Sequence, residues 1–280
     1  MHLVPTLIHA LTTATLAAAV TPTRRSLPLS LNPTPQDLSN VTTGVSMRAP
    51  QALTNAKRLA LGLPLLRPHR RITAPPTSSP LPPVPQRCNI RAVGTDNTDF
   101  GYLSPLWNGF GEYGMFQASP DGALELAFSY SPGSPSQISI TAANGPSAMY
   151  SFFGAIVGFA STSNDFGLGS YHYAYLGGTT QTAAGAPPSS DGDNSFSAAT
   201  GISKDIESAI WSYDPVTHAL TAQWVNTDGA APATHIVYAN DSNKALAITG
   251  DVVAFQDTFG APYPELLFTC VPPTPVTTTY

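Results

Sequence analysis

At residues 123–130 the sequence reads Ala-Leu-Glu-Leu-Ala-Phe-Ser-Tyr, in which large apolar side chains alternate with small or polar ones. The even-numbered residues, from Leu124 to Tyr130, would share one face of an extended chain, and the odd-numbered ones, from Glu125 to Ser129, the other. Because successive side chains of a strand point to opposite faces, this period of two predicts a half-buried β-strand.

Similar segments follow between clusters of Gly, Pro, Asn and Ser. Strands are predicted at 137–141, 150–159, 207–213, 220–225, 233–238, 245–249, 251–256 and 266–270. The turn at Asp214-Pro predicts a hairpin, in which Trp211 and Trp224 belong to the core and pack across the strand pair. One short helix is predicted at 202–208. Strands at this spacing without helical crossovers predict an all-β domain, namely an antiparallel β-sandwich of the jelly-roll kind.

The composition divides the chain near residue 88. The first aromatic residue is Phe100, whereas residues 1–87 hold half of the 28 prolines. Ten of the 12 basic residues lie in the first 91 positions, with a single acid, Asp37. A segment without aromatic residues cannot bury enough apolar surface to offset the entropy of ordering it. We therefore expect one folded domain at 88–280 behind a disordered, Pro-rich segment at 20–87, with a short helix at 50–61.

The first residues predict secretion. Residues 3–20 are apolar and uncharged, and Ala17–Ala19 supply the small side chains of a signal-peptidase site. A transmembrane helix is the alternative, but Pro5, His9 and four threonines disfavour it. We expect a signal peptide at 1–19, a secreted protein of the extracellular space or cell wall, and no membrane span in the mature chain.

Paired basic residues divide the segment that follows the signal peptide. They are Arg24-Arg25, Lys57-Arg58 and Arg70-Arg71. In a secreted chain such pairs are targets of processing proteases, and the alternative is that they are solvated charges. Cleavage after Arg58 or Arg71 would leave a strongly acidic domain. We therefore expect no nucleic-acid partner, because binding to phosphates needs clustered Lys and Arg.

The two cysteines, Cys88 and Cys270, lie at the two ends of the predicted domain. In a secretory compartment they are expected to form a disulfide that ties the first strand to the last, with two free thiols as the alternative. Asn40-Val-Thr and Asn240-Asp-Ser are N-glycosylation sequons, so Asn240 should lie on the surface if it is used.

Several motifs resemble those of a group of secreted proteins of mushroom-forming (basidiomycete) fungi. They are Thr54-Asn-Ala-Lys-Arg-Leu-Ala-Leu-Gly-Leu-Pro64, Phe110-Gly-Glu-Tyr-Gly114, Gly154-Ala-Ile-Val-Gly-Phe159, Leu176-Gly-Gly-Thr-Thr-Gln-Thr182, Ile210-Trp211, Gln223-Trp-Val-Asn-Thr-Asp-Gly229 and Thr249-Gly-Asp251. The similarity covers most of residues 50–272, apart from Leu65-Leu-Arg67, where that group has more prolines. The resemblance implies secretion and a shared β-domain, and it carries over no catalytic residue.

The most unusual segment is Tyr171-His-Tyr-Ala-Tyr-Leu176. Strand geometry places Tyr171, Tyr173 and Tyr175 on one face, where their rings could stack with sugars as an aromatic platform. Trp107, beside Asn108-Gly in a predicted loop, is a second candidate for stacking. The alternative is that the tyrosines pack inside a sandwich.

Other chemistry has weaker signals. The Gly-x-Ser-x-Gly motif is absent, and the acids Glu112 and Glu125 show no dense spacing of the kind that glycosidases use. Asp191 and Asp193 form an oxygen-rich loop that suits calcium, yet no acid occupies the position of the bidentate ligand. We therefore predict no catalytic residues, no metal and no cofactor, with calcium as the alternative.

These observations together favour a secreted, non-catalytic protein that binds glycans or the cell wall. An alternative is a structural or interaction protein of the fungal surface without a sugar site, in which the tyrosines would point inward. A secreted glycoside hydrolase is the third class, and it would require Glu112 or Glu125 to face another carboxylate in a pocket.

Overall fold

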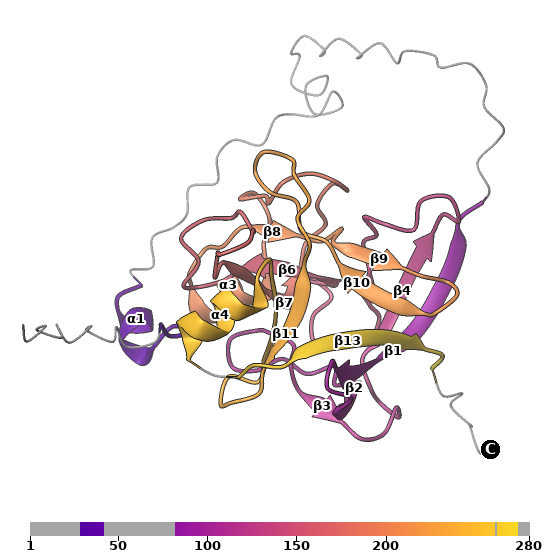
Figure 1. The fold of residues 1–280 in the computed structure, drawn as a ribbon, viewed down its shortest axis with the longest axis horizontal. Helices are drawn as coiled ribbons and strands as arrows, with labels where there is room; N and C mark the ends of the chain where they lie inside the picture. Colours follow the sequence, from indigo (N-terminus) through magenta and orange to yellow (C-terminus); the bar gives the residue numbers. More distant parts are fainter. Residues whose placement is uncertain (1–28, 42–81, 261, 274–280) are drawn as a thin grey trace, which may run out of the picture.

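The computed structural model describes residues 29–41, 82–260 and 262–273. The predicted signal peptide, the helix expected at 50–61 and the processing sites Arg58 and Arg71 lie outside these residues. The described chain is mostly β, as predicted, and its thirteen strands belong to one sheet that curves round on itself (Figure 1).

The elements have the following bounds. The strands are β1 (Val84–Gly94), β2 (Asp99–Leu103), β3 (Phe116–Gln117), β4 (Glu125–Tyr130), β5 (Thr141–Ala142), β6 (Phe152–Val157), β7 (Tyr173–Thr179), β8 (Ile206–Glu207), β9 (Trp211–Tyr213), β10 (Ala219–Ala222), β11 (His235–Ala239), β12 (Ala245–Thr249) and β13 (Glu265–Val271). The helices are α1 (Pro35–Ser39), α3 (Ser195–Thr200) and α4 (Val252–Phe259).

Eight strands form a closed antiparallel barrel, in the order β1-β4-β5-β6-β7-β12-β11-β13. The barrel closes because β13 pairs with β1, with Ile90 opposite Cys270. The remaining strands extend the sheet: β2 and β3 from β1, β10 and β9 from β13, and β8 from β6. The prediction of a jelly-roll sandwich is therefore wrong, since a sandwich needs two separate sheets and this chain has one continuous, closed sheet.

Two apolar clusters lie on the two sides of the barrel wall. The larger receives side chains from all eight barrel strands, among them Ile90, Leu126 and Phe153, so it fills the interior. The smaller lies on the outer face of β6, β7, β11 and β12, beneath α3 and α4. Strand β7 is buried on both faces, which explains its continuous run of apolar and aromatic residues.

Most predicted strands are present, and three segments differ. The segment predicted as a strand at 251–256 is the start of α4, and at 137–141 only Thr141 belongs to a strand, β5. The helix expected at 202–208 is absent: this segment is a loop that leads into β8, and the short helix α3 ends before it, at Thr200. Trp211 and Trp224 are buried as expected. They do not stack on each other across the hairpin, however: Trp211 stacks on Phe153 at 4.8 Å, and Trp224 stacks on Phe166 at 4.9 Å.

Residues 29–41 were expected to be part of a disordered segment, and the structure instead places them against the barrel. Leu31 and Asn32 are each 3% exposed. A capping box starts α1, in which the Thr34 hydroxyl accepts from the Asp37 N–H and the Asp37 carboxylate accepts from the Thr34 N–H. This segment (residues 29–41) lies beside α4 in Figure 1.

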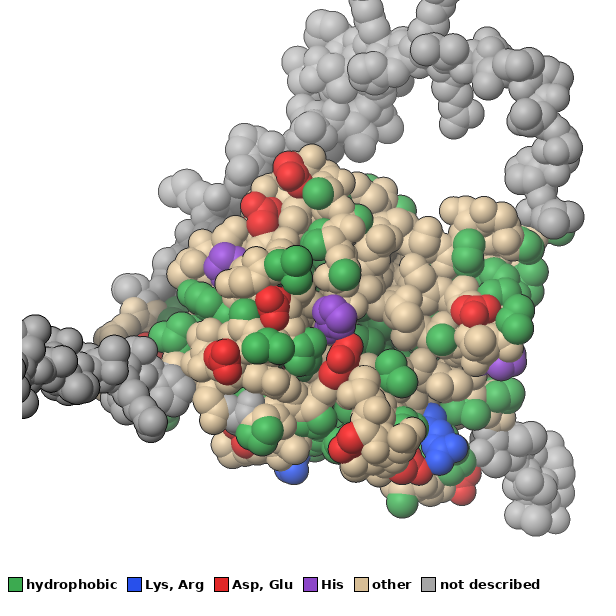
Figure 2. Space-filling view, viewed as in Figure 1, with side chains coloured by type: hydrophobic (Ala, Val, Ile, Leu, Met, Phe, Trp, Pro, Cys, Tyr) green, Lys and Arg blue, Asp and Glu red, His purple; other side chains and the backbone are tan. Residues whose placement is uncertain are grey.

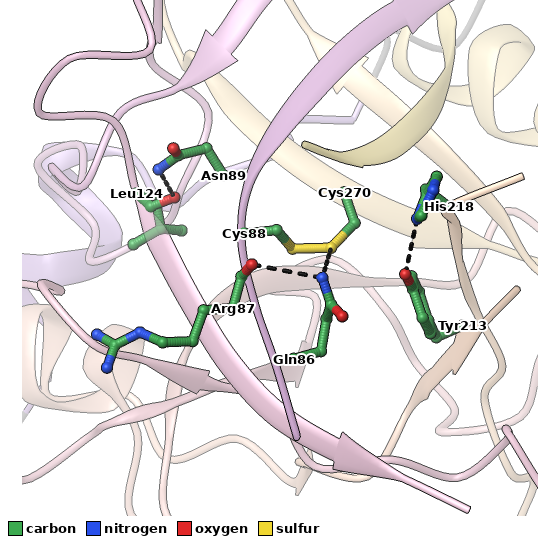
Figure 3. The surroundings of a disulfide bond; sticks show 8 residues. All are labelled: Gln86, Arg87, Cys88, Asn89, Leu124, Tyr213, His218 and Cys270. Carbon is green, nitrogen blue, oxygen red and sulfur yellow. Dashed lines mark hydrogen bonds between the residues drawn. A yellow bond between two sulfur atoms is a disulfide. The ribbon is translucent and has the colours of Figure 1, made fainter. Parts of the chain in front are cut away.

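The predicted disulfide between Cys88 and Cys270 is present and buried (Figure 3). It joins β1 to β13, whose pairing closes the barrel. The Cα atoms are 5.3 Å apart, and 182 residues separate the two cysteines in the sequence.

Helix α4 depends on its N-terminal cap. Asp251 accepts a hydrogen bond from the Ala254 N–H at 3.0 Å and another from the Gly169 N–H at 2.8 Å. We expect Asp251→Ala to lower the free energy of unfolding by about 1–2 kcal/mol, because it leaves both donors without this acceptor. Urea denaturation measures the effect. Asp257→Ala, at an exposed position of the last turn, is the control and should change stability little; an equal loss in both variants would contradict the capping role.

Candidate functional site

The predicted tyrosine stripe lies on the outer face of the barrel wall. Tyr173 and Tyr175 occupy β7 and share a face, as the alternation predicted, but each is 0% exposed, while Tyr171 is half-buried. Their rings pack with Leu31 and with aromatic residues of α3 and α4. The rings of Tyr173 and Tyr175 therefore form no exposed platform, so the expected aromatic platform is not present on the surface. The role of these tyrosines in ligand binding stays a prediction.

The hydroxyl groups of the two tyrosines converge on one acceptor. Tyr173 and Tyr175 each donate a hydrogen bond of 2.5 Å to the backbone carbonyl of Leu31, and their oxygens are 3.1 Å apart. The backbone N–H groups of Ala160 and Phe159 donate to these oxygens at 3.2 and 3.1 Å. Burial raises the pKa of both phenols, so they remain protonated donors at neutral pH.

Glu112 is placed beside this pair by a tight loop. The side-chain oxygen of Asn108 accepts from the N–H groups of Phe110 and Glu112 at 2.9 and 3.1 Å. Gly111 has φ +82°, and a Cβ atom there would lie 2.5 Å from the Ser195 carbonyl oxygen. Only glycine suits both the conformation and the contact, which explains the Gly-Glu sequence.

The Glu112 carboxyl group is fully buried and surrounded by amides. Its Oε2 accepts from Asn108 Nδ2 at 2.7 Å and from Asn32 Nδ2 at 3.0 Å. Asn32 Nδ2 also lies 3.4 Å from Asn243 Oδ1. Burial is the main influence on this carboxyl, and it raises the pKa of Glu112 to about 7, although both amide hydrogen bonds lower it.

We define the tyrosine–glutamate site as Tyr173, Tyr175, Glu112, Asn108 and Asn243. Leu31 and Asn32 fill it. Two buried oxygens at this contact, Glu112 Oε1 and Asn32 Oδ1, have no hydrogen-bond partner among the described residues. Both are acceptors when Glu112 is ionised, whereas a proton on Glu112 would supply a donor. The site thus favours a neutral Glu112, and its contacts with Leu31 and Asn32 leave hydrogen-bonding capacity unused.

Sequence reasoning singled out the tyrosines and Glu112, but it missed the three asparagines and Leu31. Asn108-Gly reads as an ordinary turn, and Asn243 lies in a polar stretch between strands. The capping box around Thr34 and Asp37 was the only local signal that residues 29–41 are ordered. Nothing local indicated that Leu31 and Asn32 are buried.

Trp107 does not join the tyrosines. It is half-buried, packs against the barrel interior and meets Tyr113 edge to face at 6.0 Å. The two tyrosines belong to the cluster on the other side of the wall. A joint stacking surface made of Trp107 and the tyrosine stripe is therefore not formed.

Asp191 and Asp193 line a cavity of about 750 Å³ formed by residues 180–183 and 186–193. Within the described ranges, no group of three or more His, Cys, Asp or Glu side chains could hold a metal ion. Calcium binding by these two aspartates stays an untested alternative.

Both sequon asparagines lie at exposed positions: Asn40 follows α1, and Asn240 lies in the turn between β11 and β12. Acidic side chains are scattered over the face that carries α4 and β13, with few basic ones between them (Figure 2). No described helix has the length and apolar character needed to cross a membrane.

Two further glutamates, Glu125 and Glu207, lie away from the tyrosine–glutamate site. Glu125 lies on the outside of β4 and pairs with Arg87 at 2.7 Å. Glu207 is buried, and both its oxygens accept from the Val225 N–H, at 3.2 and 3.3 Å. No hydrogen-bond partner of Glu112, Glu125 or Glu207 is a carboxylate in the described chain. The two carboxyls of a glycosidase stand about 5–10 Å apart without a hydrogen bond between them, so the glycosidase alternative stays a prediction.

No family model, curated protein or solved structure was found to match this chain. The function must therefore be argued from the site itself.

Proposed function

We propose that this protein is a secreted, non-catalytic binding protein of the fungal cell surface, and that the tyrosine–glutamate site holds polysaccharide chains that bear acetamido groups. The observation that carries this proposal is the pattern of contacts made by Leu31 and Asn32. One carbonyl oxygen accepts from Tyr173 and Tyr175, and the neighbouring amide donates to Glu112.

An N-acetylated amino sugar offers the same groups as this peptide. Its acetamido carbonyl matches the acceptor held by the two phenols, and its N–H and hydroxyl groups match the donor to Glu112. Its methyl group and the C–H face of its ring match the Leu31 side chain, which packs against aromatic rings. A polysaccharide without acetamido groups lacks the carbonyl and so leaves the tyrosine hydroxyls without their acceptor.

The test compares two oligosaccharides of equal length, one of chitin and one of cellulose, which differ in the acetamido or hydroxyl group at one carbon. Calorimetry is carried out on the wild type and on Asn32→Asp. This change removes the N–H donor to Glu112 and puts a carboxyl that is costly to ionise at a buried position, so it should displace residues 29–41. We expect saturable binding of the chitin oligomer by Asn32→Asp, and binding of the cellulose oligomer that is at least about tenfold weaker. Equal binding of both would contradict the proposal.

A variant of the site provides the second measurement. In the Asn32→Asp background, Tyr175→Phe removes one donor to the carbonyl and should weaken binding of the chitin oligomer about tenfold. Tyr130→Phe, on β4 and outside the site, is the matched control and should leave the affinity unchanged. Parallel titrations with and without calcium show whether Asp191 and Asp193 matter.

One observation favours the alternative of an interaction protein without a sugar site. That alternative predicted that Tyr171, Tyr173 and Tyr175 point inward; Tyr173 and Tyr175 are buried beneath the helices, and Tyr171 is half-buried. It differs from our proposal in a measurable way, because it predicts no saturable binding to any polysaccharide of a fungal and plant panel even when residues 29–41 are displaced.

A further inference from the structure

Residues 29–41 make contacts that resemble those of a bound peptide. The Leu29 N–H donates to the Thr258 carbonyl on α4 at 3.3 Å, and Val41 reaches Gly201 just after α3. Between these ends, Leu31, Asn32 and Pro33 are buried. Apart from the Leu29 contact, the hydrogen bonds from this segment to the other described residues involve the Leu31 carbonyl or the Asn32 side chain.

The contact is small for a part of a folded core. Helix α1 has no buried residue, and the buried part of the segment is confined to three consecutive positions. One leucine side chain and a few hydrogen bonds give peptide dissociation constants of roughly micromolar to millimolar. The segment therefore stays bound chiefly because residues 42–81 connect it to the barrel.

The fit of the segment is also imperfect. Glu112 Oε1 and Asn32 Oδ1 are buried and have no hydrogen-bond partner in the part of the chain that the structure describes, so the segment leaves hydrogen-bonding capacity of the site unused. A ligand with a hydrogen-bonding group beside Glu112 Oε1 would make a hydrogen bond that the segment does not make. Such a ligand can compete with the segment once the segment is free to leave.

We propose that residues 29–41 are a built-in, displaceable ligand of the tyrosine–glutamate site, and that cleavage of the chain between this segment and the barrel opens the site. The paired basic residues Lys57-Arg58 and Arg70-Arg71 lie in that connection. A protease specific for paired basic residues would hydrolyse the bond after Arg58 or Arg71. Water then gives one fragment a new carboxyl terminus and the other a new amino terminus.

Cleavage changes the binding equilibrium without changing a contact. The intact connection holds the segment at an effective concentration on the order of a millimolar or less. After cleavage, the segment must bind from solution, so it dissociates when the protein is diluted below the dissociation constant of the peptide. Only the identity of the competing glycan rests on the function proposed above.

The test uses the full chain with a recognition sequence for a site-specific protease inserted within residues 59–69. The cut protein is diluted over a concentration series, and mass spectrometry of the retained fraction reports how much N-terminal fragment remains bound. We expect release with a dissociation constant in the micromolar to millimolar range, and further release when the chitin oligomer is added. Retention of the fragment at nanomolar concentration would overturn the proposal.

A matched pair of variants tests the contact itself. Asn32→Asp should weaken retention of the fragment at least about tenfold, since it replaces the donor to Glu112 by a second carboxyl. Asn40→Asp makes the same change at the exposed end of α1 and should have no effect, in protein expressed without N-glycans. Leu31→Ala, which removes the side chain from the aromatic cluster, is the second variant if Asn32→Asp fails to fold. Equal retention by wild type and variant would overturn the proposal.

Two outcomes separate this inference from the proposed function. Release of the fragment with no binding of any polysaccharide would contradict the glycan proposal and support the built-in ligand. Equal affinity of the cut and uncut proteins for the chitin oligomer would contradict the built-in ligand and support the glycan proposal.

Discussion

Raising the pH from about 5 to about 8.5 should lower the free energy of unfolding by several kcal/mol. The reason is that two buried glutamates lose their protons less readily in the folded state than in the unfolded state. Burial raises the pKa of Glu112 to about 7 and that of Glu207 to about 8, against 4.5 for an ordinary glutamate. One pKa unit corresponds to about 1.4 kcal/mol, so the shift of Glu112 amounts to about 3 kcal/mol and that of Glu207 to about 5 kcal/mol. This is the stability lost once both groups are ionised in the folded and the unfolded state.

The direction follows from proton binding. The folded state holds these two protons more tightly than the unfolded state does. Their contribution to stability is therefore complete below the unfolded pKa, near 4.5, and is lost as the pH rises through the folded values of about 7 and 8. Aspartates outside the core, such as Asp214 and Asp251, have lowered pKa values because they accept hydrogen bonds, so they act in the opposite direction at lower pH. Measurements from about pH 5 upward avoid that range.

Urea denaturation at constant ionic strength measures this pH profile. Glu112→Gln and Glu207→Gln should each flatten the profile, since a neutral amide has no proton to lose. Glu125→Gln is the control, because Glu125 lies on the surface beside Arg87, and it should keep the wild-type slope. A wild-type profile that is flat over this range would show that the two buried carboxyls ionise without cost.

The alternation of Tyr171-His-Tyr-Ala-Tyr predicted which side chains share a face, and the structure confirms this for Tyr173 and Tyr175. The same pattern could not show what covers that face. The covering residue Leu31 lies 142 positions before Tyr173, and contacts over such distances leave no local trace in the sequence. The sequence therefore indicated that the tyrosines are unusual and left their burial as an alternative, but it did not predict which residue covers them.

The fold class shows a similar limit. Strands of a sandwich and of a barrel have the same period of two, so the pattern predicted the all-β class correctly without distinguishing the two. The distinction depends on the pairing of β1 with β13, which joins the two ends of the domain. The two cysteines predicted this proximity, and the disulfide confirms it.

The mistaken strand at 251–256 has a different origin. Val252 and Val253 favour a strand by propensity, and the window is too short for a helical period to be clear. The helix signals lay at its ends, where Asp251 caps the first turn and Gly260 adopts φ +73° at the C-terminus. Phe255 and Phe259, four residues apart, then pack against the ring of Tyr173. Capping residues were thus more informative here than propensity.

Removal of the disulfide, by Cys88→Ala together with Cys270→Ala, should lower the free energy of unfolding by about 5 kcal/mol, according to the chain-entropy model. The bond connects residues 182 positions apart, so its loss gives the unfolded chain nearly all the freedom of an open domain. The folded state loses little in comparison, since β1 and β13 stay paired through six residue positions.

Urea denaturation of the double variant measures this effect, and reduction of the wild type should produce a loss of similar size. Agreement between the two would assign the loss to the cross-link, because alanine removes the buried sulfur atoms and reduction keeps them. A loss in the double variant without one in the reduced protein would instead point to packing, since both cysteines are buried in the barrel interior. The chain-entropy model gives an upper estimate, because an unfolded chain that keeps some structure has less freedom to gain. A loss well below about 2 kcal/mol in both experiments would mean that the strand pairing, not the disulfide, holds the barrel closed.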